Sequence, residues 1–357
     1  MDRVNVTKSF LPPLDEYQKY LKRIWQNGQL TNQGPLVKEF ETKAMDYLGV
    51  KNFHFLANGT LALQLALRAL KIDGGEVITT PFSYVASTSA ILWERCTPVF
   101  VDIDPETLCI DAGKIEAAIT GNTKAILAVH VFGIACDLEA IDKVAKKHNL
   151  KVIYDGAHAF GVQYHGKSLL DYGDIATCSF HATKLFHTIE GGAIITPHED
   201  ISADIELMKR FGHNGDEHIQ LGINAKATEV QAAMGLCNLK YIDQIIEKRK
   251  SISEKYDQLL GTNVKKPKIA ADVKYNYAYY PVIFDSEAQL LGKMDALKRE
   301  NIFPRRYFYP SLNQLPYLER SQACPVSEDV ARRVLCLPLH AELEPKTVGR
   351  IAEMVKL

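Results

Sequence analysis

The sequence predicts an α/β protein with a mostly parallel sheet flanked by helices and a smaller α/β domain at its C-terminal end. Its 357 residues are more than one small core requires. From about residue 53, short apolar runs alternate with runs that carry leucine and alanine at helical spacing. After about residue 240, a long charged helical run leads into a segment with less regular alternation. We therefore expect a large domain over residues 1–240 and a small domain over residues 241–357.

Short runs rich in apolar and β-branched residues predict strands in the large domain, at residues 53–56, 77–80, 99–101, 125–129, 151–154, 175–180 and 193–196. Helical spacing predicts helices between several of them, at residues 61–70, around 90–92 and at 137–148. Strands that are apolar along their whole length are typical of a parallel sheet covered by helices on both faces. In the small domain we expect a helix at 241–260 and a strand at 277–284.

Composition excludes several classes of protein. The net charge of −1 disfavours binding to nucleic acid. No run of about eighteen apolar residues predicts a membrane span, and the first residues lack the pattern of a signal peptide. The seven cysteines are odd in number and widely spaced, without a CxxC pair, which favours reduced thiols in a cytoplasmic protein. We expect neither a disulfide framework nor a metal site.

Two features at the ends of early strands suggest contacts with a ligand, because ligands gather at the carboxyl ends of parallel strands. In the turn at residues 57–60, Gly59 and Thr60 open a helix whose exposed N–H groups can bind an anion. Tyr84 follows the second strand, where its ring can stack on a flat ligand. Taken alone, a helix cap supplied by Thr60 and a core aromatic at Tyr84 are the simpler interpretations.

Two later strands lead into residues with reactive side chains. Asp155 follows the strand at 151–154, where its carboxylate can pair with a protonated ring nitrogen of a ligand. Lys184 follows the strand at 175–180, and a lysine that loses solvent can form a Schiff base with an aldehyde. Ser179 can donate to a phosphate. Taken alone, a turn-capping Asp155 and a surface Lys184 are ordinary alternatives.

Together these features predict a specific cofactor. Pyridoxal phosphate requires an anion cradle, a stacking surface, a partner for its pyridinium nitrogen and an amine for its aldehyde. The turn at residues 57–60, Tyr84, Asp155 and Lys184 supply these after successive strands. Because the combination is far more specific than any one member, we predict that pyridoxal phosphate is bound on Lys184 of an enzyme that moves an amino group.

The segment at residues 179–184, Ser-Phe-His-Ala-Thr-Lys, and the Glu-Gly-Gly that follows at 190–192 carry a resemblance to a known family. The chain resembles the DegT/DnrJ/EryC1/StrS family of pyridoxal-phosphate-dependent nucleotide-sugar aminotransferases over nearly its whole length. The resemblance implies fold type I, the fold of aspartate aminotransferase. It also implies that Lys184 carries the cofactor and that Asp155 binds its ring nitrogen. The other implied cofactor contacts are Gly59, Thr60 and Ser179 at the phosphate and Tyr84 on the ring face.

Two departures from the family pattern bear on the cofactor. Residues 222–226, Gly-Ile-Asn-Ala-Lys, resemble the family's Gly-Tyr-Asn-Tyr-Arg, whose asparagine reaches the phosphate in the neighbouring subunit. Asn224 therefore implies a homodimer with active sites shared across the interface. His158 stands where the family commonly has a glutamine that bonds the cofactor's 3′ oxygen. A histidine can still donate such a bond, and the alternative is a histidine satisfied by backbone groups.

The resemblance also implies the reaction. L-Glutamate would give its amino group to a nucleotide-linked keto-deoxy sugar by ping-pong kinetics. The first choice is dTDP-4-keto-6-deoxy-D-glucose, giving dTDP-4-amino-4,6-dideoxy-D-glucose for surface polysaccharide such as O-antigen, and a 3-keto acceptor is the alternative. Arg305 and Tyr309 lie in a segment that either contacts the diphosphate or is a surface loop. His181, Arg210 and His213 are further candidates for substrate contacts.

Three rival functions make different predictions. A pyridoxal-phosphate-binding regulator without turnover would keep the cofactor residues and remains open. A dehydratase branch of the family carries histidine in place of the lysine, so Lys184 argues against it. A nicotinamide-dependent sugar enzyme predicts a GxGxxG after the first strand, and the sequence has none there.

Overall fold

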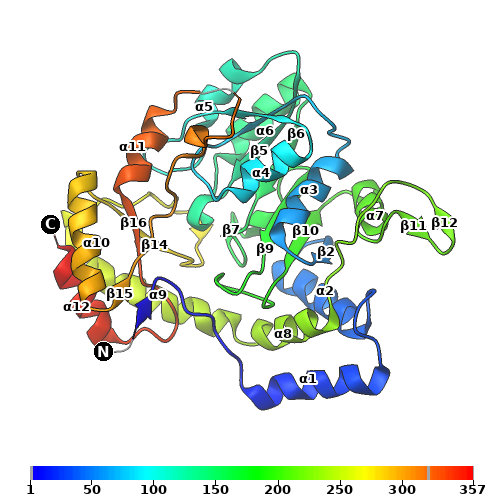
Figure 1. Cartoon of the computed structure of the whole chain (residues 1–357), viewed down its shortest axis with the longest axis horizontal. Coiled ribbons are helices and arrows are strands. Elements are labelled where there is room, and N and C mark those ends of the chain that lie inside the picture. Colours follow the sequence, from blue (N-terminus) through cyan, green and yellow to red (C-terminus); the bar gives the residue numbers. More distant parts are fainter. Residues whose placement is uncertain (1–2, 320–321, 357) are drawn as a thin grey trace.

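The computed structural model describes residues 3–319 and 322–356. At its centre is a seven-stranded sheet with the order β2-β10-β9-β6-β5-β3-β4 (Figure 1). Only β10 runs antiparallel to its neighbours, which confirms the predicted mostly parallel sheet. The strands are β2 (Asn52–Leu56), β3 (Glu76–Thr79), β4 (Thr97–Phe100), β5 (Thr123–Val129), β6 (Lys151–Asp155), β9 (Ile175–Ser179) and β10 (Gly192–Thr196).

Helices flank this sheet. The helix α3 lies across β2, β9 and β10, and α2 packs on both β2 and α8. Two of the helices lie before the first predicted strand, where sequence reasoning placed no element: α1 follows Pro13, and α2 begins at a proline and ends before Gly49. The helices are α1 (Leu14–Asn27), α2 (Pro35–Leu48), α3 (Gly59–Ala69), α4 (Ala86–Trp93), α5 (Ala112–Ile115), α6 (Leu138–His148), α7 (Glu199–Met208) and α8 (Glu229–Leu239).

A second hydrophobic core lies in the C-terminal part of the chain, reached through the long helix α9 (Ile242–Leu260). It gathers side chains from Ile252 to Val355. The division at residue 240 stays a prediction, and β1 (Val4–Asn5) pairs with β15 (Ile302–Phe303), so the start of the chain lies against this part (Figure 1). Its other elements are α10 (Glu287–Arg299), α11 (Pro325–Arg333), α12 (Pro345–Val355) and the antiparallel pair β14 (Tyr280–Ile283) and β16 (Val334–Leu337).

Short elements complete the described chain. The hairpin of β11 (His213–Asn214) and β12 (Glu217–His218) projects from the body beyond α7 (Figure 1). A small sheet joins β7 (Gln163–Tyr164) to β8 (Lys167–Ser168) and β13 (Val273–Lys274). Single 3-10 turns lie at Glu116–Ala118, Val131–Gly133, Leu169–Asp171, Gly261–Asn263 and Leu312–Gln314.

The seven cysteines are all free and buried. Within the described part of the chain, no helix has the length and apolar character needed to span a membrane. No group of three histidine, cysteine, aspartate or glutamate side chains is placed to hold a metal ion in residues 3–319 and 322–356.

Candidate active site

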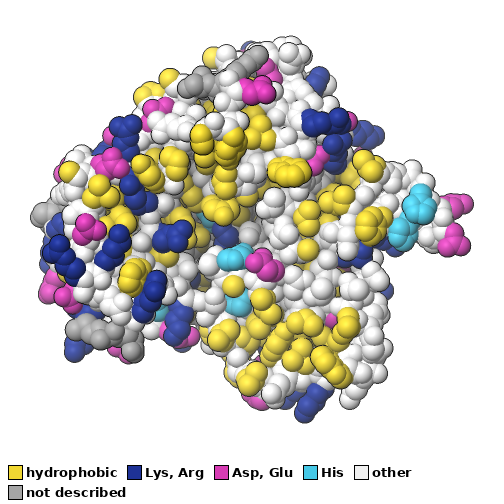
Figure 2. Space-filling model, in the orientation of Figure 1, with side chains coloured by type: hydrophobic (Ala, Val, Ile, Leu, Met, Phe, Trp, Pro, Cys, Tyr) yellow, Lys and Arg dark blue, Asp and Glu magenta, His cyan; other side chains and the backbone are white. Residues whose placement is uncertain are grey.

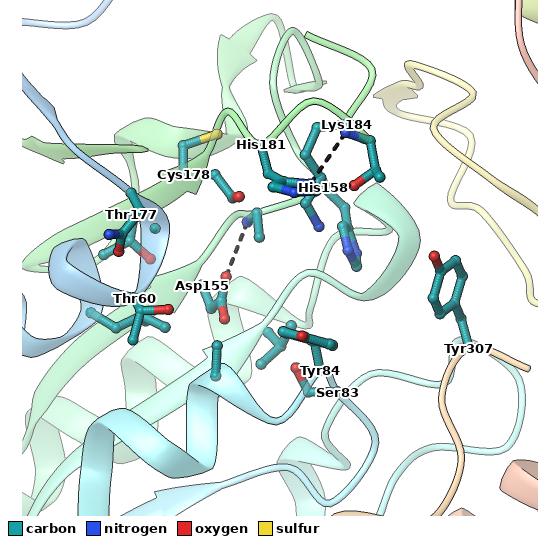
Figure 3. Close-up of a pocket in the computed structure, with 18 of the residues that line it drawn as sticks. Thr60, Ser83, Tyr84, Asp155, His158, Thr177, Cys178, His181, Lys184 and Tyr307 are labelled. Atoms are coloured by element: carbon teal, nitrogen blue, oxygen red, sulfur yellow. Dashed lines mark hydrogen bonds between the residues drawn. The ribbon is translucent and has the colours of Figure 1, made fainter. Parts of the chain in front are cut away.

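A cavity of about 360 Å³ lies beyond the carboxyl ends of β2, β3, β6 and β9. Figure 3 shows Thr60, Tyr84, Asp155 and Lys184 converging on it, while Tyr307 approaches from the C-terminal part of the chain. The sequence therefore predicted which strand ends meet. The candidate residues in the wall of the cavity are Gly59, Thr60, Tyr84, Asp155, His158, Ser179, His181, Lys184 and Arg305.

The turn after β2 forms one end of the cavity. The cap of α3 is Asn58, whose side chain accepts a hydrogen bond from the backbone N–H of Leu61 at 2.9 Å, so Thr60 is not the cap that the sequence suggested. A Cβ at Gly59 would lie 3.0 Å from the Cβ of Ser179, which means that a larger residue would fill the space between them. The first N–H groups of α3 and the Ser179 hydroxyl thus meet at one point, an arrangement that suits a phosphate.

Asp155 ends β6 at the floor of the cavity and is buried. One carboxylate oxygen accepts from the Ser87 hydroxyl at 2.8 Å, and the other accepts from the backbone N–H of Ala157 at 3.0 Å. The Ser83 hydroxyl, which lines the cavity, lies 2.9 Å from that of Ser87. Burial raises the pKa of Asp155, while these donors and the charge of Lys184 oppose the rise. A protonated ring nitrogen is a natural partner for such a carboxylate.

Lys184 lies in the loop after β9, across the cavity from Tyr84 (Figure 3). Burial lowers the pKa of its amine, and the nearby carboxylate of Asp155 opposes that shift. A lowered pKa increases the neutral fraction of the amine at physiological pH, and the neutral amine is the form that attacks an aldehyde. The position and the electrostatics of Lys184 therefore fit a lysine that carries pyridoxal phosphate.

His158 lies in the wall of the cavity, where one of its ring nitrogens has a backbone partner, and its contact with the cofactor stays a prediction. Its Nδ1 accepts a hydrogen bond from the backbone N–H of Phe132 at 3.1 Å, so the neutral ring carries its proton on Nε2. Burial lowers the pKa of His158 well below the usual range, which keeps the ring neutral. The ring stacks on Phe308, with centroids 5.8 Å apart. One ring nitrogen is thus satisfied by the backbone, and the other remains a donor toward the cavity.

A model of the DegT/DnrJ/EryC1/StrS aminotransferase family matches residues 14–356. The chain belongs to this family. Two relatives, from Shigella dysenteriae and Escherichia coli, are each named dTDP-4-amino-4,6-dideoxy-D-glucose transaminase. The Shigella relative is 42% identical over 98% of this chain and 98% of its own length. The Escherichia coli relative is 40% identical over 99% of this chain and 98% of its own length. The crystal structure of DesI in the presence of its TDP-sugar product is 32% identical, with a TM-score of 0.94 over 99% of this chain and 93% of that chain.

Membership confirms both the resemblance drawn from the sequence and the enzyme class, an aminotransferase. In this aminotransferase, four candidate residues lie outside the cavity of their own chain: Arg210, His213, Asn224 and Tyr309. Arg210 and Asn224 form a bridge at the base of the projecting hairpin that carries His213. The ring of Tyr309 lies 3.5 Å from the guanidinium carbon of Arg306. Their contacts with cofactor or substrate stay predictions.

Several residues in the wall of the cavity were not singled out from the sequence. Asn58 and Ser83 adjoin residues that were, so the same strand-end signal could have found them. Tyr307 and Phe308 lie within the segment that the sequence marked for the diphosphate, whereas no local pattern marks Tyr279. Glu190, which entered only as part of a motif, also lines the cavity.

Proposed function

We propose that this aminotransferase uses pyridoxal phosphate to move an amino group from L-glutamate to dTDP-4-keto-6-deoxy-D-glucose, giving dTDP-4-amino-4,6-dideoxy-D-glucose. The observation that carries the proposal is the convergence of Lys184, Asp155 and the Gly59 turn on one cavity. Two relatives that share about 40% of the sequence bear the name of that reaction. We further propose that the product serves surface polysaccharide such as O-antigen and that the enzyme acts in the cytoplasm, where thiols stay reduced.

Each cofactor residue has a distinct task in this proposal. The N–H groups at Gly59 and Thr60 and the hydroxyl of Ser179 bind the phosphate. The ring of Tyr84 covers one face of the cofactor. Asp155, oriented by Ser87 and Ala157, holds the proton of the ring nitrogen. His158, whose Nδ1 accepts from the backbone of Phe132, donates its Nε2–H to the 3′ oxygen.

Lys184 has two tasks. Its neutral amine forms the covalent link to the cofactor, and after a substrate amine displaces it, Nζ takes up and returns the proton that moves during transfer. When bound, pyridoxal phosphate supplies an aldehyde and a ring that accepts electrons. In this proposal Arg305, which lines the cavity, binds the diphosphate of the sugar nucleotide by two parallel hydrogen bonds.

We also propose a homodimer in which Asn224 of one subunit reaches the phosphate of the other. Large apolar side chains are exposed on two parts of the chain, near α1 and around the projecting hairpin, at Leu11, Leu14, Trp25, Leu30, Phe211, Ile219 and Leu221. Figure 2 shows hydrophobic side chains gathered over the lower part of this face, where Figure 1 places α1 and α8. Exposed apolar groups at this density are typical of a surface covered by a partner.

The experiment follows the two half-reactions. The purified protein is incubated with pyridoxal phosphate, its visible absorbance band is recorded, and L-glutamate and then the keto sugar are added. We expect glutamate to shift the band, the sugar to restore it, and mass spectrometry to find the 4-amino sugar. Lys184→Ala should lower turnover by at least about 10⁴-fold and lack the covalent band.

The alternatives give different results in the same assay. A protein that takes up no cofactor contradicts the proposal outright. A band that glutamate leaves unchanged favours the regulator without turnover or another amine donor. Product formed only from a 3-keto acceptor favours the 3-aminotransferase.

A further inference from the structure

A second pair of polar side chains lies at the mouth of the cavity. His181 and Glu190 both line it, and their side chains are 46% and 56% exposed. The Nε2 atom of His181 lies 3.5 Å from a carboxylate oxygen of Glu190. Neither side chain contributes to the cofactor site proposed above, although both line the same cavity.

The proton of the neutral His181 ring faces Glu190. The Nδ1 atom of His181 accepts from the backbone N–H of Thr183 at 3.2 Å, and the Thr183 hydroxyl lies 2.7 Å from the same atom. Because a backbone N–H can only donate, Nδ1 is the acceptor and the neutral ring carries its proton on Nε2. The loop that leads to Lys184 thus fixes which edge of His181 donates.

The backbone of Glu190 is fixed as well. Its carbonyl oxygen accepts from the Thr188 hydroxyl and from the side chain of Gln231, each at 2.7 Å. Gln231 also donates to the carbonyl of Ala57, directly before the turn at Gly59. These contacts tie the backbone of Glu190 to the turn that suits a phosphate, so its side chain starts from a fixed point at the mouth of the cavity.

A carboxylate at this position is unexpected on electrostatic grounds. Both proposed substrates are anions, and Glu190 and Asp155 are the two carboxylates in the wall of the cavity. Asp155 faces the cofactor, so Glu190 would only repel the substrates unless it accepts a hydrogen bond from one of them. A sugar hydroxyl is both donor and acceptor. A carboxylate oxygen and an imidazole nitrogen 3.5 Å apart suit such a hydroxyl, because the hydroxyl oxygen can lie about 2.8 Å from both atoms.

We propose that His181 and Glu190 form a subsite for a ring hydroxyl of the acceptor sugar, the one on carbon 3. This inference rests on the proposed function. A hexose with a carbonyl on carbon 4 and no oxygen on carbon 6 keeps ring hydroxyls on carbons 2 and 3 alone. Carbon 3 adjoins the reacting carbon, which must meet Lys184, three residues from His181. Carbon 2 lies toward the phosphate on carbon 1.

The test separates the two half-reactions and uses two acceptors. Wild type, Glu190→Gln and His181→Phe are each measured in single turnover with L-glutamate, with dTDP-4-keto-6-deoxy-D-glucose and with its 3-deoxy analogue. We expect His181→Phe to lower kcat/KM for the parent acceptor by about 100-fold, since the hydroxyl loses its donor. Glu190→Gln should lower it by about 10-fold, since a neutral amide oxygen accepts a weaker hydrogen bond than a carboxylate. The rate with glutamate should change by less than about 3-fold. Glu199→Gln, which removes an exposed carboxylate paired with Lys51, is the control and should match wild type.

The 3-deoxy analogue decides between recognition and a general defect. It should react about 100-fold more slowly than the parent with wild type, and the variants should not slow it further. Equal losses with glutamate and with both acceptors would overturn the subsite and leave the aminotransferase function in place. A wild-type enzyme that reacts with glutamate but never with the parent acceptor would overturn the proposed acceptor and this subsite together.

Discussion

On the sheet side of the cavity, Asp155 accepts hydrogen bonds at both carboxylate oxygens. On the opposite side, Arg305 has no ion-pair partner among the described residues, and its guanidinium lies near the ring of Tyr307. The sheet side consists of strand ends and the first turn of α3, each fixed by backbone pairing. The opposite side consists of Tyr279, Arg305, Tyr307 and Phe308 from the C-terminal part. There the guanidinium of Arg305 lies 5.5 Å from the centroid of the Tyr307 ring.

The difference matches two different tasks. A cofactor that stays bound requires groups held in place before the reaction, because positions that are fixed in advance need no reorganisation during it. Two successive substrates of different size require a wall whose side chains can change partner between them. We therefore expect substitutions on the sheet side to change the rate of the chemical step, and substitutions on the opposite side to change the binding of substrate.

Among substitutions that leave Lys184 intact, the largest effect should follow Asp155→Asn. The amide cannot hold a proton on the ring nitrogen, so the ring loses much of its capacity to accept electrons. We expect the single-turnover rate with L-glutamate to fall by about 10³-fold, on the scale of a lost electrostatic contact in an active site. The visible band should remain, because Lys184 is intact. A loss of less than about 10-fold would contradict the inference that Asp155 keeps the ring nitrogen protonated.

A smaller effect should follow Arg305→Gln on the opposite side. Loss of the guanidinium removes a two-pronged contact with the diphosphate, and we expect KM for the sugar nucleotide to rise by about 30-fold with little change in kcat. Arg306→Gln is the neighbouring control. Its guanidinium pairs with Glu287 at 2.7 Å and lies outside the cavity, so it should lower the melting temperature and leave KM unchanged. A fall in kcat alone for Arg305→Gln would contradict the comparison.

The sheet side is also the part of the site that the sequence predicted best. Apolar strands end in residues that stand out against them, and parallel pairing brings those ends to one edge, as for Asp155 and Ser179. The opposite side could not be found in this way. Tyr279 and Tyr307 reach the cavity because they pack with side chains of the large core that come from distant parts of the chain, and no spacing in the local sequence records that packing.

Partners within the site were equally hidden from the sequence. Ser87 lies in a helix whose alanines predict only its secondary structure, yet its hydroxyl bonds the carboxylate of Asp155, 68 residues later. The helices α1 and α2 lie before the region in which apolar runs alternate with helical runs, so that alternation does not predict them. Arg210 and His213, predicted near the sugar, lie outside the cavity of their own chain, Arg210 in a bridge with Asn224 and His213 in the hairpin, and their contacts with substrate stay a prediction.

The smallest effect is that of Asp155→Asn on the stability of the protein without cofactor. The substitution should raise the stability, whereas it should lower the rate. Burial raises the pKa of Asp155 in the folded chain above its value in the unfolded chain. Such a group stabilises the fold below its unfolded pKa, and that contribution is lost as the pH rises through the folded pKa. At neutral pH the buried carboxylate therefore lowers stability, whereas an asparagine does not ionise.

Asp155→Asn should accordingly raise the melting temperature at pH 7 by about 2–4 °C, as expected where an active site sacrifices stability for function. The gain should shrink as the pH falls toward the usual range of aspartate, since Asp155 then takes up its proton and the two side chains become equivalent in charge. Thermal unfolding of the wild type and of Asp155→Asn, without cofactor and between pH 5 and pH 8, measures this gain in melting temperature. A gain that is independent of pH would mean that packing rather than charge separates the variants. A loss at neutral pH would mean that the hydrogen bonds from Ser87 and Ala157 outweigh the burial of the carboxylate.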